Sequence, residues 1–493
     1  MAKDTQPLKL NKLFRPYNPW WARPDGKQIS LFPALPEFHR PIFQKLYEDL
    51  QNIPQMLSIT GPRRVGKSTL LRQMIQRLLS EGIPASRLLY YSFDDPALAT
   101  SKVNVDAVID DAMKAVLRNP ESGPTYLFLD EIHKLDRWEL YLKKYYDLEY
   151  PIRVIVSGSA SSPIFKKSRE SLLGRVKDYH LLPFSFREFV LFRLRDNPEA
   201  LAELDRIYEK GKSIQDMLTE APGISVKGVG IEKPSETLQL ELEALLDQYL
   251  LEGGFPEVWR LPTWVAKQEY LYDNQVKKVI YEDLVFATEF RKPELLKRFY
   301  ISLLERPGQE VAVQAVSQET AINSPQIEKY IPLLEMTDLV YRIPKYRSGA
   351  LRVRRGMMKF YLVDLALRNA ALRLNHTALQ DDDAIRGLYA ENLVFLALRK
   401  WRGTVQMDYF REKDKEVDFI VHLGPRRHWP VEVKYRNQIK SSDARGIEAF
   451  MRKCPTSVTP VLVTKHWRDL GIHHGERIQV FHIPLILFLL LFD

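Results

Sequence analysis

Cysteine and long apolar segments are what this sequence of 493 residues lacks. Its single cysteine, Cys454, excludes an internal disulfide and a cysteine-based metal cluster. The longest apolar stretch, residues 483–492, falls short of the about 20 residues that a membrane-spanning helix needs, and we interpret it as a buried closing segment. The start, MAKDTQPLKLNKLFRP, has no apolar core of a signal peptide. We therefore predict a cytoplasmic protein without a membrane partner.

Basic residues outnumber acidic ones. Lysine and arginine total 72 against 63 for aspartate and glutamate, which gives a net charge of +9. This balance favours polyanionic partners. The apolar share of 45% and the charged share of 27% are typical of a globular protein, and the length suffices for about three or four domains. The sequence shows no internal repeat or low-complexity tract.

Residues 61–68, GPRRVGKS, match the phosphate-binding pattern GxxxxGK[ST]. They lie between a predicted strand at 55–60 and a predicted helix at 69–79, which is the context that the pattern requires. Glycines let backbone amides surround phosphate oxygens, Lys67 neutralises phosphate charge and Ser68 ligates Mg²⁺. A glycine turn without nucleotide is the alternative. The predicted nucleotide-binding residues here are Gly61, Arg64, Gly66, Lys67, Ser68 and Thr69.

Two acidic residues end a second apolar strand, YLFLDE at 126–131. After a phosphate-binding loop this is a Walker B pattern, in which Asp130 holds the Mg²⁺ shell and Glu131 polarises the attacking water. A third strand, 153–156, is followed by Ser157 and Ser159, either of which can sense the γ-phosphate unless the turn is a plain serine turn. The alternation of these strands with helices predicts an α/β fold with a parallel sheet.

Arg175 follows Gly174 just before another strand-like segment at 180–183. An arginine at this place can reach from one subunit to the nucleotide of the next and stabilise the charge of the transition state. An ordinary surface arginine is the alternative.

These motifs together resemble the AAA+-like ATPases of bacteria and archaea that carry a C-terminal domain with a restriction-endonuclease-like fold. The resemblance covers about residues 40–493, and it implies that Arg175 is a finger acting in trans and that Pro256 packs on the adenine from the lid. The chain departs from the usual pattern at Arg63 and Arg64 and in a long insertion near 195–240. Beyond the motifs above, the resemblance rests on LLGRVKDYHLLPFSFREF at 172–189, GGFPE at 253–257, KFYLVD at 359–364, EVDFIV at 416–421 and PVEVK at 430–434.

A segment without acids, residues 341–360, follows three predicted helices that begin near 294. The third helix starts at a cap residue followed by a first-turn proline, Asn323-Ser324-Pro325, and the whole pattern predicts a winged helix. In the wing we expect phosphate contacts and stacking of Tyr341 and Tyr346 on bases. A solvated face or a subunit contact is the alternative. The predicted DNA-binding residues are Arg342, Lys345, Arg347, Arg352, Arg354 and Arg355, with Lys359 at the end of the segment.

The C-terminal region carries the PD-(D/E)xK pattern of nucleases. Glu391 lies in a predicted helix, Asp418 in a strand, and Glu432 and Lys434 on one face of the next strand. Asp418 and Glu432 are the predicted ligands of Mg²⁺ or Mn²⁺, and Lys434 would orient a water molecule. The order also resembles archaeal Holliday-junction resolvases, which indicates branched DNA. A domain that only binds is the alternative.

We therefore predict an AAA+ type P-loop core with a helical lid, a winged helix and a restriction-endonuclease-like domain. With ATP and Mg²⁺ it would form a ring, as a hexamer, and remodel DNA by branch migration of Holliday junctions. The alternative is a signalling or defence switch controlled by ATP, whose C-terminal domain binds a partner. The predicted boundaries are an N-terminal arm at 1–37, the core at 38–190, the lid with its insertion at 191–290, the winged helix at 291–375 and the nuclease-like domain at 376–493.

Overall fold

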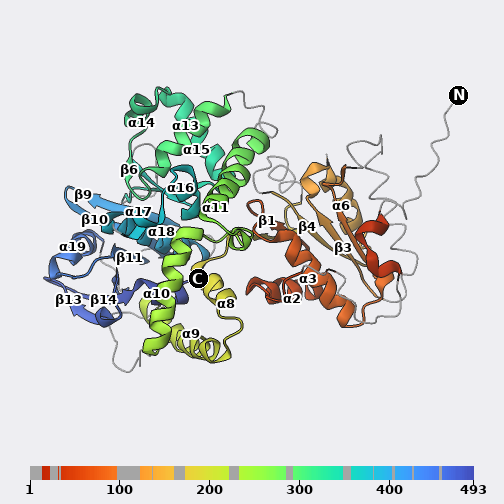
Figure 1. Ribbon diagram of the computed structural model, residues 1–493, viewed down its shortest axis with the longest axis horizontal. Helices are drawn as coiled ribbons and strands as arrows, with labels where there is room; N and C mark the ends of the chain where they lie inside the picture. The colour runs from red at the N-terminus through yellow and green to blue at the C-terminus, as the bar shows by residue number, and fades with distance from the viewer. Residues whose placement is uncertain are drawn as a thin grey trace. The chain divides into compact units, whose positions relative to one another are not determined.

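The computed structural model separates the chain into two compact units, Met1–Leu182 with Asp283–Phe290 and Pro183–Glu282 with Arg291–Asp493 (Figure 1). Each unit is described by itself. The residues that the structure describes are 14–22, 32, 35–96, 123–135, 137–159, 172–220, 233–284, 292–347, 357–380, 382–401, 406–424, 427–454 and 458–493.

The first unit is built on a five-stranded parallel sheet in the order β2-β3-β4-β1-β5. Because helices lie between the strands in sequence, the strands are nearly continuous apolar runs, as in β1, which is buried throughout. The parallel sheet confirms the predicted α/β arrangement. In such a sheet the loops that follow the strands all lie at one edge. The elements are β1 (Met56–Thr60), β2 (Leu88–Ser92), β3 (Thr125–Asp130), β4 (Ile152–Ser157), β5 (Val176–His180), α2 (Ile42–Asn52), α3 (Lys67–Ser80) and α6 (Trp138–Asp147).

The outer strand β2 is covered by the N-terminal arm, whose helical turns are η1 (Arg15–Tyr17) and η2 (Pro19–Ala22). The amide of Asn18 mimics a neighbouring strand: its Nδ2 donates to the Tyr90 carbonyl at 2.9 Å, and its Oδ1 accepts from the Tyr90 N–H at 2.8 Å. Trp20 donates to the Leu88 carbonyl at 3.1 Å. The arm therefore satisfies part of the edge of the sheet.

The second unit begins with helices. A capping box starts the first of them, since Glu188 N–H donates to Ser185 Oγ and Ser185 N–H donates to the Glu188 carboxylate. Much of the predicted insertion is the long helix α9, and its residues 221–232 lie outside the described residues. The elements are α8 (Phe186–Arg193), α9 (Pro198–Thr219), α10 (Glu236–Glu252), η6 (Val258–Arg260) and α11 (Trp264–Leu271), continued by the π-helical turns η7 (Tyr272–Lys277) and η8 (Val279–Asp283).

Three helices and a small antiparallel sheet in the order β6-β8-β7 follow. Asn323 caps the third helix by accepting from the Gln326 N–H at 2.9 Å, as predicted. The element order agrees with the predicted winged helix, whose identity stays a prediction. The elements are α13 (Pro293–Leu304), α14 (Val313–Thr320), α15 (Ser324–Met336), β6 (Glu310–Val311), β7 (Val340–Pro344), β8 (Met358–Leu362), α16 (Leu365–Ala371) and α17 (His376–Gln380).

The chain ends in a six-stranded mixed sheet in the order β13-β14-β12-β11-β10-β9. The apolar C-terminal stretch forms the end of β14 and the wholly buried helix α20, which confirms the predicted closing segment. No helix among the described residues is long and apolar enough to cross a membrane. The elements are α18 (Asp383–Trp401), β9 (Met407–Glu412), β10 (Lys415–Gly424), β11 (Arg427–Lys434), α19 (Arg445–Lys453), β12 (Val461–Thr464), β13 (Gly471–His474), β14 (Gln479–Pro484) and α20 (Leu485–Leu491).

Candidate functional site

The phosphate-binding loop joins β1 to α3, at the edge where the parallel strands end. Gly61 and Gly66 have φ of +143° and +100°, which glycine adopts far more readily than other residues. A Cβ on Gly61 would lie 1.9 Å from the Leu181 carbonyl oxygen, so the turn has no room for a side chain. Ser68 and Thr69 fall in the first turn of α3, whose N-terminus carries the positive end of the helix dipole.

Lys67 is buried inside this loop. Its Nζ donates to the carbonyl oxygens of Pro62 at 2.8 Å and Gly61 at 3.1 Å. Arg64, at the tip of the loop, has a left-handed backbone with φ of +63°. The loop thus holds an ammonium group against its own backbone, beside the helix N-terminus, where it attracts a phosphate anion.

The two acids of the Walker B pattern lie at the end of β3, next to the end of β4. Asp130 is buried and accepts hydrogen bonds from Ser157 Oγ and from the Tyr90 hydroxyl at 2.8 Å. Ser157 Oγ in turn accepts from the Glu131 N–H at 3.2 Å. The Ser157 hydroxyl therefore contacts the Asp130 carboxylate and the Glu131 backbone, and Tyr90, on the neighbouring strand β2, supplies a second contact to Asp130.

Glu131 has a backbone conformation that is uncommon for its residue type, with φ of +52°. Burial raises the pKa of its carboxyl group, while Lys67 opposes this shift. His133 Nδ1 lies 3.4 Å from the Glu131 carboxylate and accepts from the Ser159 N–H at 3.4 Å. Because burial lowers the pKa of His133 to about 4, this imidazole is neutral near pH 7. The site thus places a carboxyl group with a raised pKa beside an uncharged ring.

Sequence reasoning did not single out Tyr90 or His133. A signal existed for His133, which stands two residues after Glu131 in the same turn. Tyr90 reaches Asp130 through the pairing of β2 with β3, which no local pattern reveals.

Oxygen atoms suited to Mg²⁺ are present at this edge. The Ser68 hydroxyl and the Asp130 carboxylate are hard ligands of the kind that Mg²⁺ prefers. They belong to the first turn of α3 and the last residue of β3, which lie at the same edge of the parallel sheet. The donor set therefore fits the predicted ion.

Arg63, one of the two unusual arginines of the loop, is bound by a carboxylate. Its Nε donates to Asp283 Oδ2 at 2.8 Å, and a second guanidinium nitrogen contacts Oδ1 of the same residue. This bidentate pair joins the phosphate-binding loop to Asp283, which belongs to the same unit of the chain.

Arg175 lies at the opposite edge of the sheet. Its carbonyl accepts from the N–H of Met56, the first residue of β1, whereas the phosphate-binding loop follows the last residue of that strand. Five residues at about 3.3 Å each separate the two edges by about 16 Å. Arg175 pairs with Asp147, with Nε 2.6 Å from Oδ1. It therefore faces away from the phosphate site of its own chain, and its role in another subunit stays a prediction.

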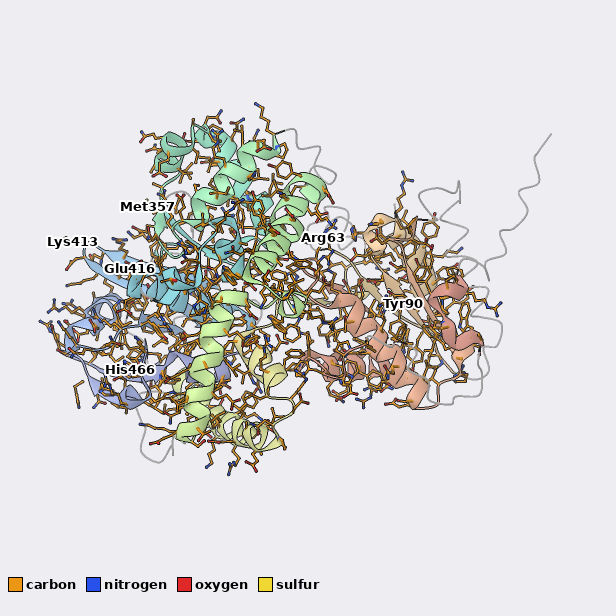
Figure 2. The ribbon with its side chains drawn as sticks, viewed as in Figure 1. Arg63, Tyr90, Met357, Lys413, Glu416 and His466 are labelled. Carbon is orange, nitrogen blue, oxygen red and sulfur yellow. The ribbon has the colours of Figure 1, made fainter. Side chains whose placement is uncertain are left out.

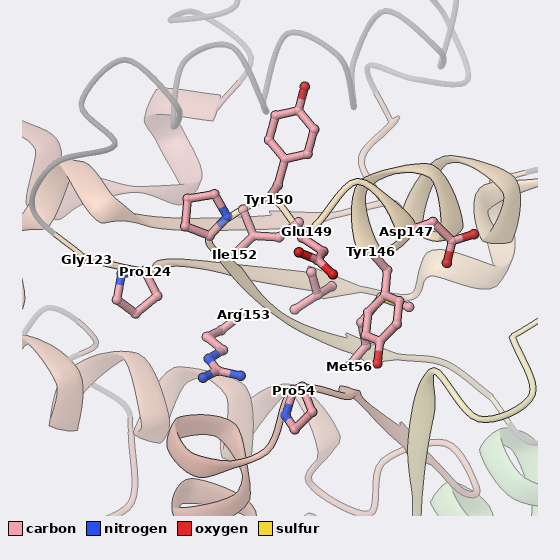
Figure 3. Close-up of a pocket in the computed structure, with 12 residues that line it drawn as sticks. Pro54, Met56, Gly123, Pro124, Tyr146, Asp147, Glu149, Tyr150, Ile152 and Arg153 are labelled. Carbon is pink, nitrogen blue, oxygen red and sulfur yellow. The ribbon is translucent and has the colours of Figure 1, made fainter.

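A pocket of about 780 Å³ opens at this same edge (Figure 3). The residues that line it lie at or before the starts of β1, β3 and β4, or at the end of α6, as shown by Met56, Pro124, Ile152 and Asp147. The pocket is therefore distinct from the predicted nucleotide site, which lies where these strands end.

The GGFPE turn is held inside the second unit. Gly254 N–H donates to Asp364 at 2.6 Å, and Gly254 O accepts from Phe184 N–H at 2.8 Å. A Cβ on Gly254 would lie 2.1 Å from the Phe184 oxygen. Burial raises the pKa of Asp364 to about 6. Pro256 is half-buried in this turn, and its contact with adenine stays a prediction.

The predicted basic wing is only partly described, because Arg352, Arg354 and Arg355 lie outside the described residues. Arg342 Nε is 2.9 Å from Glu335, and Lys345 Nζ is 4.0 Å from Glu310. These two side chains therefore have acidic neighbours, although the segment itself contains no acid. Arg347 is exposed.

The predicted stacking of Tyr341 on a base needs correction. Tyr341 is 4% exposed, with the Arg399 guanidinium 3.4 Å from its ring centroid, so it is covered and cannot stack on a base. Tyr346 packs edge-on against Phe450 with ring centroids 5.1 Å apart. Tyr341 therefore belongs to the core, whereas Tyr346 is half-buried and its stacking on a base stays a prediction.

The four nuclease-like residues do converge. Asp418 N–H donates to Glu432 Oε2 and Val433 N–H donates to Asp418 Oδ2, both at 3.0 Å. Lys434 Nζ pairs with Glu432. Burial and the neighbouring Asp418 carboxylate raise the pKa of Glu391 to about 7 and the pKa of Glu432 to about 8.

Lys359 is the unexpected member of this cluster. Assigning it to an exposed wing is wrong, because it is 2% exposed and lies among carboxylates from α18 and β10. Within the described parts of the chain, no group of three acidic, histidine or cysteine side chains is arranged to hold a metal ion. The predicted Mg²⁺ or Mn²⁺ site at Asp418 and Glu432 is therefore not supported by the geometry.

Comparison with family models places the phosphate-binding edge within residues 54–190, which match a model described as "AAA domain". Residues 243–378 and 386–486 match two models described as domains of unknown function, DUF8612 and DUF4143. The middle model thus includes the β6-β8-β7 sheet, and the last includes the nuclease-like residues.

Among whole proteins, the chain is similar to an uncharacterized protein of Methanocaldococcus jannaschii, with 23% identity over 76% of this chain and 74% of that protein. An uncharacterized protein of Haemophilus influenzae is 22% identical over 73% of this chain and 78% of its own length. Among solved structures, C. elegans PCH-2 aligns with a TM-score of 0.25 and 14% identity, over 42% of this chain and 55% of PCH-2. Residues 54–190, with their phosphate-binding loop and Walker B strand, form an AAA-type ATPase domain.

Proposed function

We propose that this protein hydrolyses ATP and uses the turnover to remodel DNA, with branched DNA such as a Holliday junction as the favoured substrate. One observation carries the proposal: Lys67, the two acids Asp130 and Glu131, and Ser157 are gathered where the parallel strands end. Such a set suits phosphoryl transfer, in which catalysis consists mainly of positioning and charge stabilisation.

Each of these residues has a defined task. Lys67 and the amides of the loop bind the β- and γ-phosphates. Mg²⁺, when bound by Ser68 and Asp130, neutralises phosphate charge. Glu131 orients the attacking water and accepts its proton, and burial brings its pKa closer to neutral pH, which suits a general base. Ser157 keeps both acids in register.

The DNA part of the proposal rests on charge. The chain carries a net charge of +9, and the acid-free segment 341–360 includes the exposed Arg347. The proposed phosphate contacts are those of the predicted basic residues, of which Arg342 and Lys345 also have acidic neighbours. Lys359 is buried and is not among them. The others are Arg347, Arg352, Arg354 and Arg355.

The proposed assembly is a ring, as a hexamer, in which Arg175 acts on the nucleotide of the next subunit. Its place at the edge opposite its own phosphate-binding loop supports this assignment, because a residue there is available to a neighbour. Asp147 would hold the guanidinium until the neighbour's nucleotide competes for it.

A second candidate is a switch in which bound ATP sets the state and the C-terminal domain binds a partner. The bidentate contact between Arg63 and Asp283 favours this idea, since a bound phosphate would compete with Asp283 for the Arg63 guanidinium. Slow turnover with retained nucleotide is the signature of such a switch.

ATP turnover by the full chain, measured alone and with linear, forked and four-way DNA, separates the two candidates. The remodelling proposal expects turnover that DNA stimulates, most strongly in its four-way form, and ATP-dependent separation of a labelled junction. The matched control is Glu131→Gln, which should bind ATP but separate no junction. Retained nucleotide with turnover indifferent to DNA would replace this proposal with the switch.

A further inference from the structure

Lys359 lies in the middle strand of the β6-β8-β7 sheet, and its ammonium group is surrounded by carboxylates. Its Nζ lies 2.9 Å from Glu391 Oε1, 2.8 Å from Glu416 Oε1 and 3.1 Å from Asp418 Oδ1. An ammonium group has three donors, and three carboxylate oxygens are within reach of them. With only 2% of the side chain exposed, this charge is compensated by protein groups rather than by water.

The same carboxylates are engaged by other donors of the chain. Glu391 Oε1 also accepts from the Tyr361 hydroxyl at 2.7 Å. Glu432 accepts from Lys434 and from a backbone amide, and Asp418 accepts from another. A metal ion would have to displace donors from oxygens that already have them, next to a Lys359 side chain that is itself buried.

Space and charge also oppose a metal ion. A Cβ on Gly308 would lie 2.9 Å from Glu391 Oε1, so the backbone packs directly on this carboxylate. A divalent cation bound to Glu391 and Asp418 would lie a few ångström from the Lys359 ammonium, and repulsion between two cations is strong where water is excluded.

We infer that Lys359 is the resident cation of this cluster, in place of the divalent metal ion that its carboxylate pattern predicts, and that the C-terminal domain does not cleave DNA with a metal ion. The cation comes from the segment that matches one domain model, 243–378, and the acids from the segment that matches the next, 386–486. Lys359 therefore also ties these two segments together. The inference is independent of the proposed ATPase cycle.

Binding of Mn²⁺ to the nucleotide-free full chain tests this inference. Lys359→Met removes the cation and leaves its carboxylates for a metal ion, so this variant should bind one further Mn²⁺ per chain and show a higher thermal midpoint with Mn²⁺ than without it. Lys413→Met, a change of an exposed lysine before β10, is the matched control and should behave like the wild type (Figure 2). Adding Asp418→Asn to Lys359→Met should abolish the additional binding. A folded Lys359→Met variant without additional Mn²⁺ would overturn the inference.

A second measurement does not depend on that variant being folded. The wild type with Mn²⁺ should leave linear, forked and four-way DNA uncut, and its uptake of Mn²⁺ should equal that of Asp418→Asn. Cleavage or Mn²⁺ binding that Asp418→Asn removes from the wild type would show that a metal ion binds despite Lys359, and the inference would fail.

Discussion

The phosphate-binding edge of the first unit and the carboxylate cluster of the second contain the same kinds of side chains arranged in different ways. At the phosphate-binding edge, Lys67 is held by backbone carbonyls, and Asp130 is held by hydroxyl groups. In the cluster, Lys359 is held by the carboxylates themselves. Cations and anions that are fixed by neutral groups keep their charge for a ligand, whereas charges that pair with one another stabilise the fold. Convergence of acids and lysines alone does not identify a binding site.

Removing the charges of the phosphate-binding edge should have the largest effect on function, if these charges serve a ligand as the comparison implies. We expect Lys67→Ala to abolish ATP binding, and Glu131→Gln to preserve binding while lowering the turnover number by about 10²–10⁴-fold, because only the general base is lost. Nucleotide binding by calorimetry and phosphate release measure the two effects. Normal turnover by Glu131→Gln would show that another group activates the water.

Arg175→Ala is expected to have the next largest effect on turnover, a loss of about 10²–10³-fold, if the guanidinium stabilises the transition state in a neighbouring subunit. Mixing Arg175→Ala with Lys67→Ala subunits should restore part of the activity, because some interfaces then combine an intact loop with an intact arginine. Mixed assemblies that are proven to form yet stay inactive would count against action between subunits.

Replacing Arg352, Arg354 and Arg355 by alanine tests the surface charges. We expect weaker binding to DNA of every sequence and a salt dependence flatter by up to about one log unit of slope per lost phosphate contact, whereas turnover without DNA stays unchanged. The matched control is Arg342→Ala with Lys345→Ala, which should change the slope less because both residues have acidic neighbours. Equal slopes for the wild type and the triple variant would reassign the segment to protein contacts.

Lys434→Met tests whether the charges of the carboxylate cluster stabilise the fold and have no part in ATP turnover. It leaves Glu432 without its partner in a buried setting, so we expect the unfolding free energy to fall by about 1–3 kcal/mol, less than for a fully buried pair since the lysine is 31% exposed. Turnover at a temperature where the protein is folded should remain at the wild-type level. Chemical denaturation measures the change, and a loss of ATP turnover in the folded variant would contradict the separation of the two sites.

Local patterns predicted the phosphate-binding edge because its residues are contiguous in sequence. Residues 61–68 follow a buried strand directly, and Asp130 and Glu131 stand at the end of another. The rule that parallel strands end at one edge then brings them together. The two motifs and this rule were sufficient to predict where the phosphate-binding residues lie in the fold.

Long-range pairing explains what the sequence could not show. Lys359 follows a run of arginines, so its neighbours in sequence suggested an exposed wing, whereas its place in β8 brings it to carboxylates 32 and 59 residues away. Asp364 likewise meets Gly254 across 110 residues. Convergence of Asp418 and Glu432 was predictable from strand alternation, but the identity of the cation between Asp418 and Glu391 was not.

The contact between Asn18 and Tyr90 attaches residues 14–22 of the predicted N-terminal arm to the edge of the ATPase sheet. An expressed fragment that begins after this arm would expose the N–H and C=O groups of β2 along its outer side. Open strands of this kind pair with strands of other molecules and aggregate. Precipitation of such a truncated fragment would therefore show that the arm keeps the edge of β2 from pairing with other molecules. Fragments intended for crystallisation or assay should begin ahead of Phe14.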